Sequence, residues 1–140
     1  MARRGLKVFF DGGCRPNPGP TEAAVVISGT TYLFEDLGFG TSNDAEWLAL
    51  ILALELAHSL DLSDIILVGD ARDVIQEGNR ILQTGHAKPG HASTFLDLAV
   101  KAPRSRIRWI RRTQNLAGIA LAARHPRQRP CIVPAGEDEM

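Results

Sequence analysis

The hydrophobic period of the chain changes near residue 43, and this change limits the possible folds more than any other feature. Before it, short apolar stretches rich in β-branched and aromatic residues predict three consecutive strands, at 6–10, 22–28 and 31–39. After it, apolar residues recur at helical spacing, which predicts helices over 43–60, 71–82, 91–102 and 115–124. Two further apolar stretches, 64–69 and 106–110, predict strands between these helices. The pattern favours an α/β domain in which helices cover the faces of a mixed sheet.

The length of 140 residues suits one domain, expected at residues 1–125 and followed by a C-terminal extension at 126–140. Three glycines and three prolines predict a loop at 12–20. No apolar stretch reaches the roughly 18 residues of a membrane helix, and the N-terminus lacks a signal-peptide pattern. Cys14 and Cys131 lie far apart and are expected to be free thiols in a reducing compartment. We therefore expect a cytoplasmic monomer that does not bind membranes.

The net charge is zero, but the charges are distributed unevenly. Residues 11–97 hold thirteen acids and four bases, whereas residues 98–136 hold nine bases and no acid. Most of the bases are arginines, which bind phosphate through two parallel hydrogen bonds. This pattern predicts an anionic partner for the basic end, unless its arginines only solvate the surface and pair with the acidic body.

Three acids occupy special places at the ends of predicted elements. Asp11 follows the first strand, Glu46 lies near the start of the long helix, and Asp70 follows the apolar strand at 64–69. Each has an ordinary structural explanation, because Asp11 suits a turn, Glu46 suits a capping box with Asn43, and Asp70 suits a helix N-cap. If the first and fourth strands are neighbours, however, the three carboxylates converge and repel one another unless a cation neutralises them. Oxygen ligands alone suit Mg²⁺ or Mn²⁺ rather than zinc.

Three segments resemble the motifs of type 1 ribonucleases H. Residues 9–20 read Phe-Phe-Asp-Gly-Gly-Cys-Arg-Pro-Asn-Pro-Gly-Pro and resemble the first motif, an Asp-Gly pair followed by a short loop and Asn-Pro-Gly-Pro. Residues 41–46, Thr-Ser-Asn-Asp-Ala-Glu, resemble the second motif, and residues 67–71, Leu-Val-Gly-Asp-Ala, resemble the third. The element order and the spacing of the motifs fit as well, and the resemblance covers roughly residues 5–124.

The resemblance implies a ribonuclease H-like fold with a five-stranded mixed sheet in the order 3-2-1-4-5. It also implies an endonuclease that hydrolyses the RNA strand of RNA/DNA hybrids with two Mg²⁺ ions. Asp11 would bridge the ions, and Glu46 and Asp70 would complete one ion site. The substrate-binding positions that we expect from the motifs and from the basic end are Cys14, Asn17, Thr41, Asn43, Gln76, Arg111 and Arg112.

The fourth acid of the family is missing from the last predicted helix. In the pattern Asn-x-x-Ala-Asp-x-Leu-Ala, Gly118 stands in place of the alanine and Ile119 in place of the aspartate. Three explanations stay open. In the first, the enzyme is active, and Asp11, substrate phosphate and water, or another residue such as Asn115, complete its second ion site. Alternatively, the chain is a degraded nuclease that only binds nucleic acid, or a platform that binds another protein.

Overall fold

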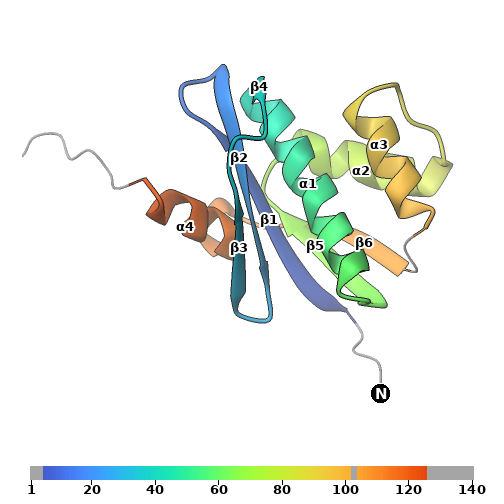
Figure 1. The fold of residues 1–140 in the computed structure, drawn as a ribbon. Helices are drawn as coiled ribbons and strands as arrows, with labels where there is room; N and C mark the ends of the chain where they lie inside the picture. Colours follow the sequence, from blue (N-terminus) through green and yellow to red (C-terminus); the bar gives the residue numbers. More distant parts are fainter. Residues whose placement is uncertain (1–4, 102–103, 126–140) are drawn as a thin grey trace, which may run out of the picture.

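The computed structural model describes residues 5–101 and 104–125, which form one mixed sheet with helices on both faces (Figure 1). The strands are β1 (Leu6–Cys14), β2 (Gly19–Ile27), β3 (Thr30–Phe34), β4 (Phe39–Gly40), β5 (Asp64–Gly69) and β6 (Arg104–Trp109). The main path of the sheet is β3-β2-β1-β5-β6, and the short β4 pairs with β2. Strand β1 is antiparallel to β2 and parallel to β5, and β5 is parallel to β6. This arrangement confirms the predicted fold and strand order.

Helices α1, α2 and α3 lie on one side of the sheet, and α4 lies on the other (Figure 1). Their bounds are Ser42–Ser59 for α1, Arg72–Thr84 for α2, His91–Ala99 for α3 and Leu116–Ala123 for α4. A single 3-10 turn, η1 (Arg112–Gln114), connects β6 to α4. No helix in the described part of the chain has the length and apolar character needed to cross a membrane.

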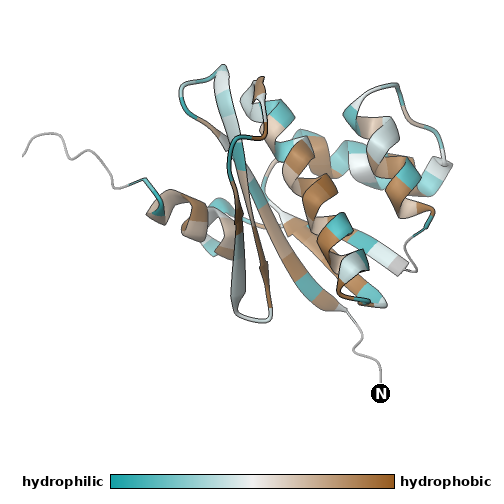
Figure 2. Cartoon of the chain, in the orientation of Figure 1, coloured by the Kyte–Doolittle hydropathy of each residue, from teal (hydrophilic) through white to brown (hydrophobic). Residues whose placement is uncertain are grey.

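The main core lies between the sheet and α1, with smaller contributions from α2 and α3. Phe10 of β1, Leu50 and Leu54 of α1 and Phe95 of α3 are buried at its centre. Figure 2 shows hydrophobic residues along the middle of α1, whereas its first turn is hydrophilic. A smaller cluster forms on the other face, where Leu121 of α4 packs with Val26 of β2. The burial on both faces explains why β5 reads as a continuous apolar stretch.

The predicted loop at 12–20 is wrong, because β1 continues to Cys14 and β2 already begins at Gly19. The glycines in this segment fit close packing rather than a turn. A Cβ atom on Gly12 would lie 2.1 Å from the carbonyl oxygen of Ala45, and one on Gly19 would lie 2.4 Å from the carbonyl oxygen of Pro16. Only residues 15–18 therefore connect the two strands.

The third predicted strand, 31–39, is divided in the structure. β3 ends at Phe34, Asp36 has a φ of 54°, and the chain resumes pairing with β2 only in β4. The left-handed backbone at Asp36 turns the chain and ends the regular ladder, and aspartate tolerates that conformation better than most residues. The predicted extension at 126–140 lies outside the described residues.

Candidate active site

Asp11, Glu46 and Asp70 converge at one end of the sheet. Each offers a carboxylate oxygen, and these three atoms lie within 4.8 Å of one another. Asp11 lies within β1, Asp70 directly follows β5, and Glu46 lies early in α1. Because β1 and β5 are parallel neighbours, their carboxyl ends meet at the same edge of the sheet. The expected carboxylate cluster is therefore present.

Close approach of α1 to β1 brings Glu46 to the two aspartates. Gly12 leaves space for the backbone of Ala45, and no residue with a Cβ atom fits there without a shift of the helix. At this contact the backbone N–H of Gly12 donates to Oε1 of Glu46 at 3.2 Å. The glycine after Asp11 thus sets the depth of the helix and also holds the side chain of Glu46.

The ordinary explanations for the three acids do not hold. The N-cap of α1 is Thr41, which forms a capping box with Asp44, so Glu46 and Asn43 do not cap the helix. The N-cap of α2 is Ala71, which makes no side-chain capping bond, so Asp70 is not the cap. Asp11 is paired within a strand and does not form a turn. Helix capping and turn formation therefore do not explain why three acids lie together here.

Asp70 is held by a buried asparagine that the motif analysis did not assign this part. The side-chain amide of Asn115, which is fully buried, donates to Oδ2 of Asp70 at 2.8 Å and to the carbonyl of Phe10 at 3.0 Å. Its Oδ1 accepts a hydrogen bond from the N–H of Ala117 at 3.1 Å and caps α4. One side chain therefore joins α4, β1 and a site carboxylate.

Trp109, the last residue of β6, supports the backbone on the other side of Asp70. Its indole N–H donates to the carbonyl oxygen of Asp70 at 3.1 Å. The guanidinium of Arg72, in the first turn of α2, stacks 3.9 Å above the tryptophan ring. No motif pointed to this role of Trp109, because its partner lies 39 positions away along the chain.

The electrostatics of the cluster favour bound cations or protons. Burial, together with the nearby charges of Asp11 and Asp70, raises the pKa of Glu46 to about 9. Burial and the charge of Asp70 raise the pKa of Asp11 to about 7, although the charge of Arg112 opposes this rise. The cluster therefore does not hold three negative charges at neutral pH without a counter-charge.

The carboxylates open into a cavity of about 310 Å³. Arg112 and Arg15 line it with basic side chains, and Cys14 and Ser42 contribute small polar ones. Glu22 of β2 adds a fourth carboxylate to the wall, but it is not part of the close cluster. This site thus combines acidic groups suited to hard cations with arginine side chains suited to phosphate.

The Glu22 carboxylate has basic partners behind it. The ring of His125 is hydrogen-bonded to its Oε2, and Nε of Arg124 lies 3.5 Å from its Oε1. Arg124 also donates to Glu35 at 2.9 Å. This network was not predictable from the sequence, because no motif surrounds Glu22 at the start of the predicted strand.

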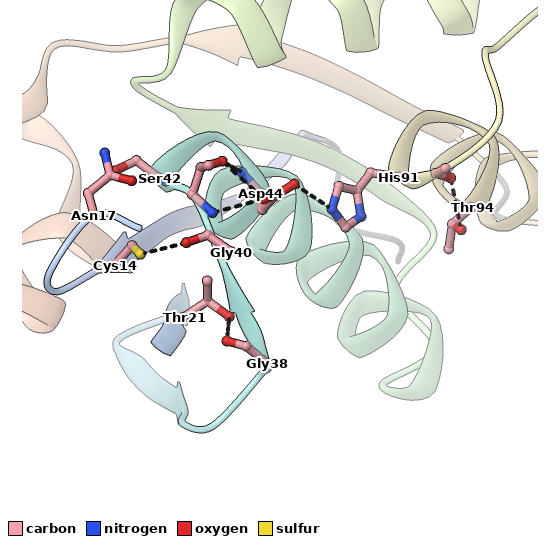
Figure 3. Close-up of polar contacts among 11 residues, drawn as sticks. Cys14, Asn17, Thr21, Gly38, Gly40, Ser42, Asp44, His91 and Thr94 are labelled. Carbon is pink, nitrogen blue, oxygen red and sulfur yellow. Dashed lines mark hydrogen bonds and ion pairs between the residues drawn. The ribbon is translucent and has the colours of Figure 1, made fainter. Parts of the chain in front are cut away.

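Two of the expected substrate-binding residues, Cys14 and Asn17, lie beside the start of α1 (Figure 3). The thiol of Cys14 donates to the carbonyls of Pro16 and Gly40, and Oδ1 of Asn17 accepts from the N–H of Ser42 at 3.1 Å. These contacts attach the connection between β1 and β2 to the start of α1.

The exposed capping box of α1, formed by Thr41 and Asp44, lies next to these contacts. Asp44 accepts hydrogen bonds from the N–H and hydroxyl of Thr41 at 2.8 and 3.0 Å, and its other oxygen contacts Nε2 of His91 at 3.1 Å (Figure 3). Helix α3 is therefore joined to the first turn of α1.

The remaining expected residues are not gathered at the carboxylates. Arg112 lines their cavity, whereas Arg111 is exposed and is not part of its lining. Asn43 lines a separate hollow of about 700 Å³ between α1, α2 and the segment before α3. Gln76 is exposed on α2 and does not line the carboxylate cavity.

Gly118, rather than Ile119, is the α4 position that lies against Asp11. A Cβ atom on Gly118 would lie 3.5 Å from Oδ2 of Asp11, and Gly118 lines the cavity. The side chain of Ile119 is not part of this lining, and the residue is 53% exposed. The α4 residue that lies against Asp11 is therefore a glycine without a side chain. The motif, in contrast, aligns Ile119 with the fourth acid.

This sheet order, with an acidic cavity at the end of its central strands, defines the class of ribonuclease H-like domains. A model of the family described as reverse transcriptase-like matches residues 9–125. The chain belongs to this family and, within it, to the type 1 ribonucleases H.

Two curated relatives and one crystal structure illustrate the similarity. Ribonuclease HI of Halobacterium salinarum is 41% identical over 72 residues, which cover 48% of this chain and 36% of that protein. Ribonuclease H of Wigglesworthia glossinidia brevipalpis is 36% identical over 74 residues, covering 50% of this chain and 45% of that protein. The match thus spans less than half the length of either relative. The crystal structure of the H. salinarum NRC-1 ribonuclease H1 aligns with a TM-score of 0.67 and 27% identity, covering 84% of this chain and 98% of that one.

Proposed function

We propose that the chain is a metal-dependent endonuclease that hydrolyses the RNA strand of RNA/DNA hybrids. The observation that carries this proposal is the convergence of three carboxylates within 4.8 Å in a cavity that also contains Arg112. Three carboxylates this close are all charged at neutral pH only with a cation between them, and an all-oxygen donor set suits Mg²⁺ or Mn²⁺. The residues present therefore fit a divalent ion held by Asp11, Glu46 and Asp70.

A bound divalent ion polarises a phosphoryl oxygen and lowers the pKa of a coordinated water. The chain's own residues keep the donor atoms in place. Asn115 holds one oxygen of Asp70, which leaves the other available, and the N–H of Gly12 orients Glu46. Because these partners are backbone groups or buried side chains, the donors are positioned before substrate arrives.

Arg112 is the residue best placed to bind the phosphate that is cut. Its side chain lines the carboxylate cavity, and its charge acts on Asp11. We assign Cys14, Asn17 and Gln76 to contacts along the RNA strand, where the 2′-hydroxyl distinguishes RNA from DNA. Thr41 and Asn43, at the start of α1, are assigned to a phosphate of the DNA strand. Arg111 is assigned to a further phosphate contact. Such contacts set the register of a duplex without reading its bases.

Cleavage of an end-labelled RNA/DNA hybrid tests this proposal, with double-stranded RNA and double-stranded DNA as control substrates. We expect cleavage of the RNA strand that requires Mg²⁺ or Mn²⁺ and leaves both controls intact. Asp70→Asn should abolish it, because the amide retains the shape of the side chain but loses the charged ligand. Asp73→Asn is the matched control, since Asp73 is an exposed acid in the first turn of α2. Equal loss in both variants, or cleavage in the presence of a chelator, would refute the assignment.

A binding module without cleavage is the second candidate. The observation that favours it is the absence of any acid from α4, whose residues 116–123 read Leu-Ala-Gly-Ile-Ala-Leu-Ala-Ala. In that case the wild-type chain binds the hybrid with a strong dependence on salt but leaves both strands intact at every magnesium concentration. Measuring binding and cleavage on the same labelled hybrid separates the two candidates.

A further inference from the structure

Basic side chains cover part of the sheet face that carries α4. Alternate residues of a strand point to opposite faces, and Ile107 of β6 packs into the core on the α1 side. Arg106 and Arg108 therefore point to the other face. Lys7 of β1 does the same, because its neighbour Val8 is buried in that core.

The pairing register places these side chains in two rows. Lys7, Ile66 and Arg106 lie side by side across β1, β5 and β6, and the next row on this face places Arg108 beside Val68. Ile66 and Val68 are only 7% and 1% exposed. A Cβ atom on Gly5 would meet both Ile66 and Nη2 of Arg106, so the arginine lies over the apolar floor. The long stems cover that floor while their charged ends face solvent.

Helix α4 borders this basic face on one side. It packs against β1, β2 and β3. Lys7 and Arg108 are exposed, and the side chain of Arg106 is 54% exposed. One acid of the same face, Asp64, pairs with Arg106 at 3.2 Å. The face is therefore an open, positively charged strip beside a helix that rises about 10 Å from the sheet.

The strip leads to the acidic cavity. Strand β6 runs from Arg106 through Arg108 to Trp109, whose indole holds the backbone of Asp70, and the chain then continues to Arg112 in the cavity wall. Alternate residues of a strand are about 6.6 Å apart, so Arg108 and Arg106 place two charges at that spacing along β6. A chain of phosphates that leaves the cavity along β6 would reach Arg108 first and then Arg106.

We propose that Lys7, Arg106 and Arg108 bind the unpaired continuation of the strand that is cut, beyond the end of the hybrid. This inference rests on the proposed function, because the strand that passes the carboxylates is RNA only if the site cleaves RNA. Helix α4 stands on β1, β2 and β3 and borders the strip on one side, so we expect a single strand to lie along β6 more readily than a duplex. A guanidinium forms two parallel bonds to phosphate and to carboxylate alike, so the choice of phosphate rests on the course of β6 toward the cavity that would hold the strand to be cut.

Binding without magnesium tests the proposal independently of cleavage. We compare a blunt hybrid with hybrids that carry a 5′ or 3′ single-stranded extension on either the RNA or the DNA strand. For single strands each phosphate contact contributes about 0.7 to the slope of log Kd against log salt. Three contacts should therefore steepen the slope by about 2 for an RNA extension on one side. The advantage of that extension should fall by about 16-fold between 50 and 200 mM salt.

Two variants locate the effect on the strip. Lys7→Ser/Arg108→Ser keeps the Arg106–Asp64 pair and should remove about 1.4 of the added slope, and adding Arg106→Ser should remove the rest. The matched control is Arg80→Ser/Lys101→Ser, which removes two exposed charges elsewhere. It should leave the difference between extended and blunt hybrids unchanged. Arg106→Lys/Arg108→Lys, which retains the charges, should keep most of the slope, and this checks that loss does not reflect unfolding.

The possible outcomes separate this inference from the proposed function. A wild-type chain that cleaves the blunt hybrid but shows no added slope with any extension overturns the inference alone. An equal effect of DNA extensions overturns the assignment to the cut strand, and equal competition by polyglutamate overturns the assignment to nucleic acid. If the hybrid is never cleaved, the proposed function fails, and the slopes still decide whether the strip binds a single strand.

Discussion

Replacing Asn115 with alanine should cost both stability and the position of Asp70. The variant loses a charge-assisted hydrogen bond to Asp70, worth about 1.5–3 kcal/mol, and the cap of α4, worth about 1 kcal/mol. It also leaves the buried carbonyl of Phe10 without this donor, which costs about 1 kcal/mol or more. Together these losses predict a decrease of about 3–5 kcal/mol in the free energy of unfolding. That is a large part of the 5–15 kcal/mol typical of a domain.

Urea unfolding in the presence of a chelator measures this loss without a contribution from bound metal. Asn79→Ala, on the exposed surface of α2, is the control and should change the free energy of unfolding by less than about 0.5 kcal/mol. Asn115→Asp keeps an acceptor for the N–H of Ala117 but puts a second carboxylate beside Asp70. Because repulsion raises the pKa of the new carboxyl, this variant should lose stability as the pH rises above about 4. A loss below about 1 kcal/mol in Asn115→Ala would refute the bridging role.

Three further predictions concern the acids and the glycines around them. Because the pKa of Glu46 is raised from 4.5 to about 9, the folded metal-free protein binds more protons than the unfolded chain between these values. Its stability should therefore decrease as the pH rises through that window, with Glu46 contributing at most about 1.4 kcal/mol per unit and Asp11 adding to the decrease below about pH 7; thermal melts should show this decrease, and added Mg²⁺ should reverse it most strongly at high pH. Gly118→Asp should raise the cleavage rate at low magnesium more than Ile119→Asp, because position 118 lies against Asp11 and Ile119 does not line the cavity; a magnesium titration in which Ile119→Asp gains more would refute this placement. Gly12→Ala should lower the melting temperature by at least about 5 °C, since its methyl group overlaps the backbone of α1, and an unchanged melting temperature would contradict the close contact.

The spacing of apolar residues along the chain was sufficient to predict the order of the main strands and helices. The apolar stretch at 64–69 became β5, and the helical spacing after residue 43 became α1, within one residue at each end. One error, the divided third strand, comes from the left-handed backbone at Asp36, and the other comes from glycines whose contacts are distant in the sequence. Gly12 and Gly13 suggested a turn, but Gly12 accommodates a helix that lies 33 or more residues further along the chain. Such packing leaves no trace in the local pattern.

The acids of the candidate site were predictable from the sequence, whereas the groups that hold them in place were not. Asp11, Glu46 and Asp70 stood out because each lies at the end of an element, and the parallel pairing of β1 and β5 brings them together. The groups that hold them were not predictable, since Asn115 and Trp109 contact Asp70 from 45 and 39 positions away. The position on α4 that faces Asp11 also depends on the rotation of a short helix, which a motif alignment does not fix.

The bond between Asn115 and Asp70 also relates the site to the order in which the chain is synthesised. A ribosome completes all three carboxylates by residue 70, but the amide that orients the last of them is added 45 residues later. Until α4 leaves the exit tunnel and docks, Asp70 lacks this partner and β1 lacks its cover on that face. A nascent chain that still lacks α4 therefore carries the acids without their final arrangement. Maturation of the site coincides with the docking of the last described helix, so a chain halted before Asn115 should not have a preorganised metal site while it is still attached to its own messenger RNA.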